Sequence, residues 1–168
     1  MKAAVLLLCI AAQSAFAGDG DSPRIVFTKS FPQSSPAYVW IAVERAGEVS
    51  YKEDADDDPE KFQLEQSGVD QMFNLAAQLD HFKRPLESGL TVANMGLKTF
   101  RWEDGETVSE QKFNYSLDES AKALQDWFEA ISETEQLLAE LKRAARHDKL
   151  AVHEVLINVE NCWIQRRL

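Results

Sequence analysis

The chain has 168 residues, of which 45% are hydrophobic and 27% charged, and its formal net charge is −10. This apolar fraction excludes wholesale disorder, and the length fits one domain that can bury a core of its own. Nucleic acids and anionic membrane surfaces repel an acidic protein, so the sequence predicts no nucleic-acid partner.

The first 17 residues are typical of a secretory signal peptide. Lys2 supplies a positive start, residues 3–12 form a short apolar run, and Ala15 and Ala17 are the small residues that a signal peptidase reads. The run is too short to cross a bilayer, and no later segment approaches the length of a transmembrane helix. We therefore expect a secreted or periplasmic protein, cleaved near Ala17/Gly18, with no membrane span.

Removal of this leader would leave Cys162 as the single cysteine and a formal charge of −11, because 17 basic and 28 acidic residues remain. An intramolecular disulfide then cannot form, so stability has to come from packing. Cys162 falls on a helical face between Val159 and Trp163, which favours a buried thiol. The alternative is an exposed thiol that links two chains. The sequence predicts a monomer or a weak homodimer.

In chain order, the apolar pattern first predicts three strands, at residues 24–29, 37–45 and 49–53. The second strand is apolar on both faces. Val39, Ile41 and Val43 point to one side, while Tyr38 and Trp40 form an aromatic strip on the other. The first of these faces has to be buried, and the aromatic strip is either covered by another element or left open for binding.

A helix is predicted after the acidic stretch 53–60. Ser67 and Asp70 have the spacing of a helix cap, and a single apolar face follows, made of Val69, Met72, Phe73, Ala76 and Leu79. Residues 81–96 have no clear period and are expected to form a long loop, with a short element around residues 90–93.

The clearest hairpin of the chain comes next. Strands at residues 97–103 and 108–115 flank Asp104-Gly105, a pair that accepts the positive φ of a tight turn. From Ser116 the pattern is helical. Capping boxes at Ser116/Glu119 and Ser132/Glu135 predict two helix starts, and a break at residues 147–149 precedes a final helix at 150–167.

This order predicts an α+β fold: an antiparallel sheet of about five strands (βββ-α-ββ) with a helical C-terminal extension. The predicted divisions are a signal peptide at residues 1–17, the α+β domain at 18–131, and an extension at 132–168 packed on the domain. Wide apolar patches are rare on monomers, so we expect the helical tail to cover the Tyr38 and Trp40 strip.

No motif in the sequence predicts a metal site. Asp54, Asp56, Asp58 and Glu65 occupy places 1, 3, 5 and 12 of a calcium-loop pattern, but the glycine place holds Pro59. A solvated acidic turn is the better interpretation. The histidines, His81, His147 and His153, lack the spacing of a zinc pair. We predict no metal and no cofactor.

Catalytic residues are not indicated either, because the chain has no Gly-x-Ser-x-Gly elbow and no distinctive carboxylate pair. The long loop is the better candidate for function, since His81, Lys83 and Arg84 give it a local positive charge on an acidic protein. A loop that only wraps the sheet edge is the alternative. The candidate interaction surface therefore comprises Tyr38, Trp40, His81, Lys83, Arg84 and Asn94.

The predicted strand at 37–45 opens with Ser34-Ser35-Pro36-Ala37-Tyr38 and is followed by a turn and a return strand that contain Gly47, Val49 and Tyr51. This arrangement resembles the start of a family of secreted bacterial domains of unknown function. Those domains begin with Cys-x-x-x-Cys-Pro-x-Tyr and continue, like this chain, with a helix, a hairpin and another helix. The likeness covers about residues 24–131. Phe31 and Ser35 replace the two cysteines, and the resemblance implies no activity.

From these observations we expect a non-enzymatic module that binds a protein or peptide. Two alternatives remain open. One is a cell-envelope hydrolase whose active site combines His81 with scattered carboxylates. The other is an inhibitor of an extracellular enzyme, a role that suits a small acidic domain.

Overall fold

The computed structural model describes residues 22–164, so the predicted signal peptide lies outside the described residues. Along this range the elements are β1 (Arg24–Ser30), β2 (Tyr38–Glu44), β3 (Glu48–Lys52), β4 (Glu60–Gln63), α1 (Gln66–Gln78), the 3-10 turn η1 (Asp80–Phe82), β5 (Leu97–Asp104), β6 (Thr107–Phe113), α2 (Glu119–His147) and α3 (Ala151–Ile164).

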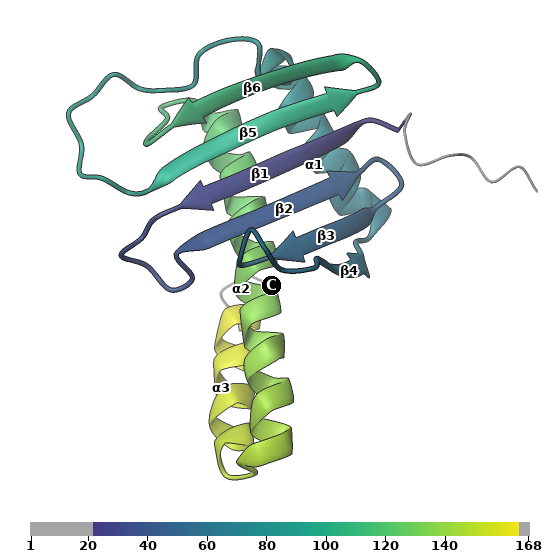
Figure 1. Ribbon diagram of the computed structural model, residues 1–168, viewed down its shortest axis with the longest axis vertical. Coiled ribbons are helices and arrows are strands. Elements are labelled where there is room, and N and C mark those ends of the chain that lie inside the picture. The colour runs from purple at the N-terminus through teal and green to yellow at the C-terminus, as the bar shows by residue number, and fades with distance from the viewer. Residues whose placement is uncertain (1–21, 165–168) are drawn as a thin grey trace, which may run out of the picture.

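The strands form one antiparallel sheet in the order β4-β3-β2-β1-β5-β6 (Figure 1). The predicted α+β class is confirmed. Strand β1 lies at the centre, where Phe27 pairs with Ile41 on one side and with Phe100 on the other. These three side chains share one face of the sheet and are almost fully buried.

Strand β4 is the element that the sequence pattern missed. Its four residues include a single apolar side chain, Phe62, and the strand runs along the sheet edge beside β3. The turn between β2 and β3 holds it there, because Leu64 donates its N–H to the carbonyl of Gly47 at 3.0 Å. Gly47 has φ +89, and a Cβ at this position would lie 2.4 Å from Nε2 of Gln63. The Gln63 side chain could move aside, but the positive φ and the backbone carbonyl of Leu64, 3.0 Å from such a Cβ, favour glycine here.

Helices α1 and α2 lie side by side against one face of the sheet (Figure 1). The rings of Phe27 and Phe128 stack with centroids 4.9 Å apart, and Phe100 lies 5.7 Å from Phe27 and 6.0 Å from Phe128. Burial of each such side chain contributes about 1.5–3 kcal/mol. The predicted apolar face of α1 is buried as expected, namely Val69, Met72, Phe73, Ala76 and Leu79.

The expectation that C-terminal helices cover the aromatic strip is wrong. Tyr38 and Trp40 point to the opposite face from Phe27 and Ile41, and both remain partly exposed. The apolar stripe of α2 packs instead on the face that carries Phe27 and Phe100, because that face offers the larger apolar area.

The predicted helix start at Ser132 is also wrong, since α2 runs without a break from Glu119 to His147. Ser132 is buried within the helix and accepts a hydrogen bond from Gln136 Nε2 at 2.8 Å. Beyond Gln136 the helix leaves the sheet and packs along α3. We call this projecting pair, residues 137–164, the arm (Figure 1). Asp148 caps α3 after the predicted break.

No helix within residues 22–164 is both long enough and apolar enough to cross a lipid bilayer.

Capping differs in detail from the prediction. Helix α1 begins one residue before Ser67, and its N-cap residue, Glu65, makes no side-chain capping bond. Helix α2 is capped by Asp118, two residues after the predicted Ser116. The Asp118 Oδ1 atom accepts hydrogen bonds from the N–H groups of Ser120 at 2.9 Å and Ala121 at 3.2 Å. Ser116 instead accepts a hydrogen bond from the N–H of Asp118.

Replacing Asp118 should destabilise the protein in a pH-dependent way. Burial opposes ionisation, but the hydrogen bond from Arg84 and the N–H donors outweigh it and lower the pKa of Asp118. A carboxyl group whose pKa is lower in the folded state stabilises the fold at every pH above its unfolded-state pKa. This contribution is lost as the pH falls to the folded-state pKa. Asp118→Ala should cost about 1 kcal/mol at neutral pH in urea unfolding.

The variant Asp118→Asn isolates the charge, because asparagine also caps helices. Wild type should be the more stable protein at neutral pH, and the difference should disappear at acidic pH, below the lowered pKa. A difference in unfolding free energy that stays constant with pH would contradict this role of the carboxylate.

Candidate interaction site

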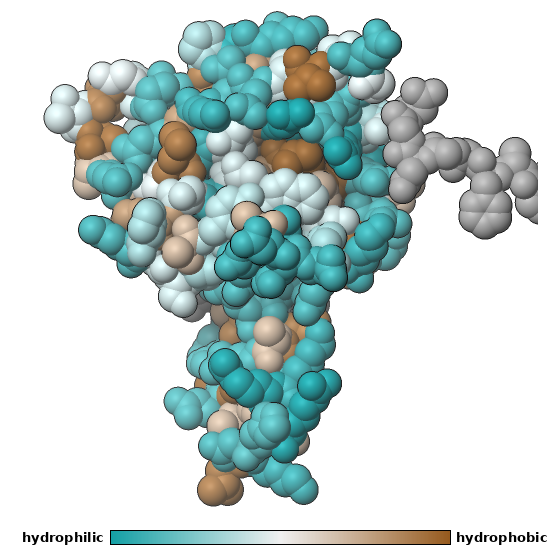
Figure 2. Space-filling model, in the orientation of Figure 1, coloured by the Kyte–Doolittle hydropathy of each residue, from teal (hydrophilic) through white to brown (hydrophobic). Residues whose placement is uncertain are grey.

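The uncovered face of the sheet contains a hollow of about 360 Å³. Its floor consists of the smaller side chains on the central strands, Val26, Thr28 and Thr99, of which Val26 is buried beneath its longer neighbours. Figure 2 views this face: neutral and hydrophobic residues gather over the middle of the sheet and hydrophilic residues surround them. The hollow is lined by Arg24, Val26, Thr28, Tyr38, Trp40, Thr99, Arg101, Glu103 and Glu110.

Aromatic side chains form one flank of the hollow. Trp40 lies opposite Thr28 on β1 and opposite Lys52 on β3, and the Lys52 Nζ is 5.7 Å from the Trp40 ring centroid. This cation–π contact orients the indole beside the hollow. Tyr38 follows on the same strand, and burial raises the pKa of its hydroxyl. The phenol therefore stays neutral and can donate a hydrogen bond.

A ladder of ion pairs forms the other flank. Glu103 accepts hydrogen bonds from the Nε atoms of Arg24 and Arg101, the second at 2.6 Å. Glu110 then lies 3.6 Å from an Arg101 nitrogen and 3.2 Å from Lys112 Nζ. Burial tends to raise the pKa of Glu103, but the two arginines outweigh it and lower that pKa. The Glu103 carboxylate at the centre of the ladder therefore stays charged at neutral pH.

The charge of this face differs from that of the whole chain. The strand register places five basic and four acidic side chains on it, namely Arg24, Lys52, Lys61, Arg101 and Lys112 against Glu44, Glu48, Glu103 and Glu110. The excess of negative charge lies elsewhere. A partner that the acidic surface would repel can therefore approach this face.

His81 lies on the other side of the sheet from Tyr38 and Trp40. Its ring centroid is 4.3 Å from that of Trp102, a buried residue that projects from β5 beside Phe100. Among residues 22–164, no hydrogen bond or ion pair joins the His81 imidazole to a carboxylate. The geometry gives His81 a packing contact.

The remaining candidates from the long loop are also dispersed. Arg84 binds the carboxylate of Asp118, Lys83 is exposed, and the Asn94 side chain accepts a hydrogen bond from the N–H of Gly96. No helix or strand forms at residues 85–96, so the expected short element there is absent. The structure thus brings together only Tyr38 and Trp40 of the six candidates.

Asn114 is the residue that shapes the long loop. Its side chain accepts from the N–H of Met95 at 2.7 Å and donates to the carbonyl of Ala93 at 2.9 Å. Its own N–H donates to Glu87 at 2.6 Å, and its carbonyl accepts from the buried Lys98 at 2.8 Å. These bonds hold the loop against the end of β6. Sequence reasoning missed Asn114 because it follows a strand without any local motif.

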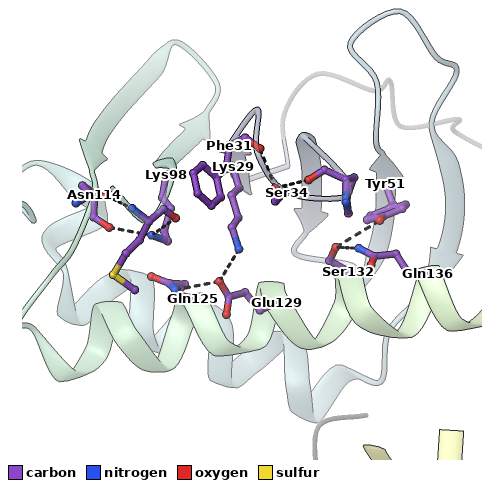
Figure 3. Close-up of polar contacts among 12 residues, drawn as sticks. Lys29, Phe31, Ser34, Tyr51, Lys98, Asn114, Gln125, Glu129, Ser132 and Gln136 are labelled. Carbon is purple, nitrogen blue, oxygen red and sulfur yellow. Dashed lines mark hydrogen bonds and ion pairs between the residues drawn. The ribbon is translucent and has the colours of Figure 1, made fainter. Parts of the chain in front are cut away.

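A second hollow, of about 230 Å³, lies between α2 and the β1–β2 end of the sheet. Polar groups of its lining bind one another (Figure 3): Lys29 pairs with Glu129 at 3.1 Å, and Gln136 donates to the Ser132 hydroxyl at 2.8 Å. The Tyr51 hydroxyl, next to this hollow, lies 3.4 Å from the same Ser132 oxygen. Burial is the main cause that raises the pKa of Tyr51. These contacts attach α2 to the sheet and leave few groups for a ligand.

The acidic stretch forms an exposed loop between β3 and β4. Within the described range, no three His, Cys, Asp or Glu side chains are grouped so as to hold a metal ion. Cys162 is partly exposed rather than buried, and its Sγ lies 3.9 Å from an oxygen of Glu133.

Comparison with known proteins adds no relative, since neither a protein-family model nor a curated protein sequence matches this chain.

The turn that holds His81 stores backbone strain, and this can be measured. Asp80, His81 and Phe82 have φ values of +52, +49 and +62, a conformation that side chains with a Cβ rarely adopt. The Asp80 side chain is exposed, and within residues 22–164 it makes no hydrogen bond or ion pair that would compensate. Asp80→Gly should therefore raise the free energy of unfolding by about 1 kcal/mol, as measured with urea. The matched control, Asp80→Ala, should lower the free energy of unfolding. If Asp80→Ala stabilised the protein instead, the turn would not be strained.

Proposed function

We propose that this protein is a non-enzymatic interaction module that binds an extended protein or peptide segment on the uncovered face of its sheet. One observation carries the proposal: a hollow of about 360 Å³ lies between an aromatic pair and an ion-pair ladder, on a face that no described helix covers. An exposed face with apolar content is characteristic of a binding surface.

The two flanks suit different parts of a ligand. Tyr38 and Trp40 offer broad, rigid surface at low cost in conformational entropy, as in other peptide-binding sites. Thr28 and Thr99 line the floor and carry hydroxyl groups that can bond to polar groups of a peptide. In the ladder each charge already has an opposite partner, so stacking and shape would select the ligand more than net charge.

The alternatives that the sequence leaves open have less support. A hydrolase centred on His81 would need a carboxylate or another catalytic group beside the imidazole, whereas the ring packs on Trp102. An inhibitor of an extracellular enzyme is one form of interaction module, and it could use the same face. We include in the proposal that the protein is exported, since residues 1–17 have the pattern of a signal peptide.

Removal of the Trp40 indole should weaken peptide binding. Peptides selected from a random displayed library on immobilised wild type should bind Trp40→Ala about 30-fold more weakly, the effect of losing an aromatic hot spot. Leu117→Ala is the matched control, because Leu117 is 53% exposed and lies outside the sheet. Circular dichroism should show both variants folded. Equal affinity of selected peptides for wild type and Trp40→Ala would exclude this face as the site.

Export can be tested without a ligand. The protein purified from its natural host should begin near Gly18 on amino-terminal sequencing, because the signal peptidase reads Ala15 and Ala17. Recovery of the intact amino terminus from cytosol would contradict export and would leave the sheet-face proposal unaffected.

A further inference from the structure

A third hollow, of about 280 Å³, lies where the arm leaves the sheet, and most of its lining is acidic. It is enclosed by the loop between β3 and β4 on one side and by α2 on the other. Five carboxylates line it, with one lysine. The complete lining is Tyr51, Lys52, Glu53, Asp57, Asp58, Glu60, Glu135 and Ala139.

Glu135 is the unusual member of this acidic hollow. It is only 9% exposed, and none of its described contacts is a hydrogen bond or a close ion pair. Burial, together with the nearby Glu60, raises the pKa of this carboxyl group, and Lys142 opposes the rise from a longer distance. Lys142 itself lies 3.9 Å from Glu60. The Glu135 oxygens make no hydrogen bond within residues 22–164 and are not sealed from the hollow, so a cation that enters it can pair with this carboxylate.

The chain carries a matching basic cluster at the tip of the arm. Arg143, Arg146 and Lys149 are all exposed, and none makes a hydrogen bond or ion pair within residues 22–164. They follow one another within seven residues of a chain whose overall charge is −10. Figure 2 shows the arm standing clear of the body of the molecule, so this basic tip is accessible.

The acidic hollow and the basic tip lie on the same side of α2. Glu135, Ala139, Lys142 and Arg146 are spaced by three or four residues, which places them in one row along the helix. Glu135 and Arg146 are about 16 Å apart along the axis, from a rise of 1.5 Å per residue. If two α2 helices lie antiparallel about a two-fold axis near residues 140–141, each Arg146 faces the Glu135 of the other copy.

We propose that a second copy of this chain occupies the acidic hollow, with the two arms antiparallel and the basic tip of each chain in the acidic hollow of the other. One two-fold axis creates both contacts, as in a closed symmetric dimer. Ala139 lies near the axis, where a small side chain allows close approach. Leu138, which is 40% exposed, borders the same row and loses contact with water in the dimer. The proposal is independent of the peptide site.

Charge reversal on each side of the contact tests this arrangement. The tip variant carries Arg146→Glu and Lys149→Glu, and the hollow variant carries Asp57→Lys and Asp58→Lys. Sedimentation equilibrium of wild type should show a monomer–dimer equilibrium that weakens with added salt. Each variant alone should dimerise at least tenfold more weakly, since both contacts of the symmetric dimer become repulsive.

An equimolar mixture of the two variants should restore dimerisation. In that heterodimer, the acidic tip of one chain meets the basic hollow of the other, and the remaining contact is that of wild type. The control variant Lys83→Glu with Lys112→Glu changes the net charge as much as the tip variant does, and it should dimerise like wild type. A monomeric wild type, a control as weak as the tip variant, or a mixture that stays monomeric would each overturn the proposal.

Discussion

The position of helix α2 on the sheet determines most of the architecture. Phe128 stacks on Phe27 and contacts Phe100, so the first half of α2 is fixed over the central strands. Ala121, Leu124 and Ile131 extend the same buried stripe. Because this stripe is buried on one face of the sheet, the same half of α2 cannot also cover the opposite face. The uncovered sheet face and the projecting arm both follow from this single packing choice.

The two faces of the sheet consequently have different chemistry. The covered face is held by aromatic packing and by a row of polar contacts with α2, such as Lys29 with Glu129. On the opposite face, cross-strand ion pairs and the cation–π contact of Lys52 with Trp40 replace helix packing. These contacts fix side chains in place while leaving them accessible, which is the property that a preorganised binding surface needs.

The sequence predicts the α+β class, the hairpins and the buried face of α1 because these depend on local periodicity and turn residues. Strand β4 escapes such reasoning. Its place comes from pairing with β3 and from the Gly47 turn, both of which are non-local. The predicted helix start at Ser132 is wrong, because Ser132 and Glu135 lie inside α2 and are buried there. A serine followed by a glutamate three residues later therefore does not always mark a helix start.

The candidate site was predictable only in part. Alternation along β2 predicts that Tyr38 and Trp40 share a face, but it does not reveal that β1 and β5 bring Arg101 and Thr99 beside them. That requires the strand order. The sequence places His81 with Lys83 and Arg84 in a locally positive loop, but it does not reveal that the His81 ring packs on Trp102. Asn114, which organises that loop, carries no motif at all.

The continuity of α2 has a mechanical consequence. No turn or loop separates the segment that packs in the core from the segment that carries the basic tip, so bending between them has to deform hydrogen-bonded helix. The direction in which the arm points is therefore set by the number of helical residues between the core and the tip. Each residue inserted beyond Gln136 would rotate everything distal to it by about 100° and advance it by about 1.5 Å, without disturbing the sheet. The arm therefore keeps a fixed orientation relative to the sheet.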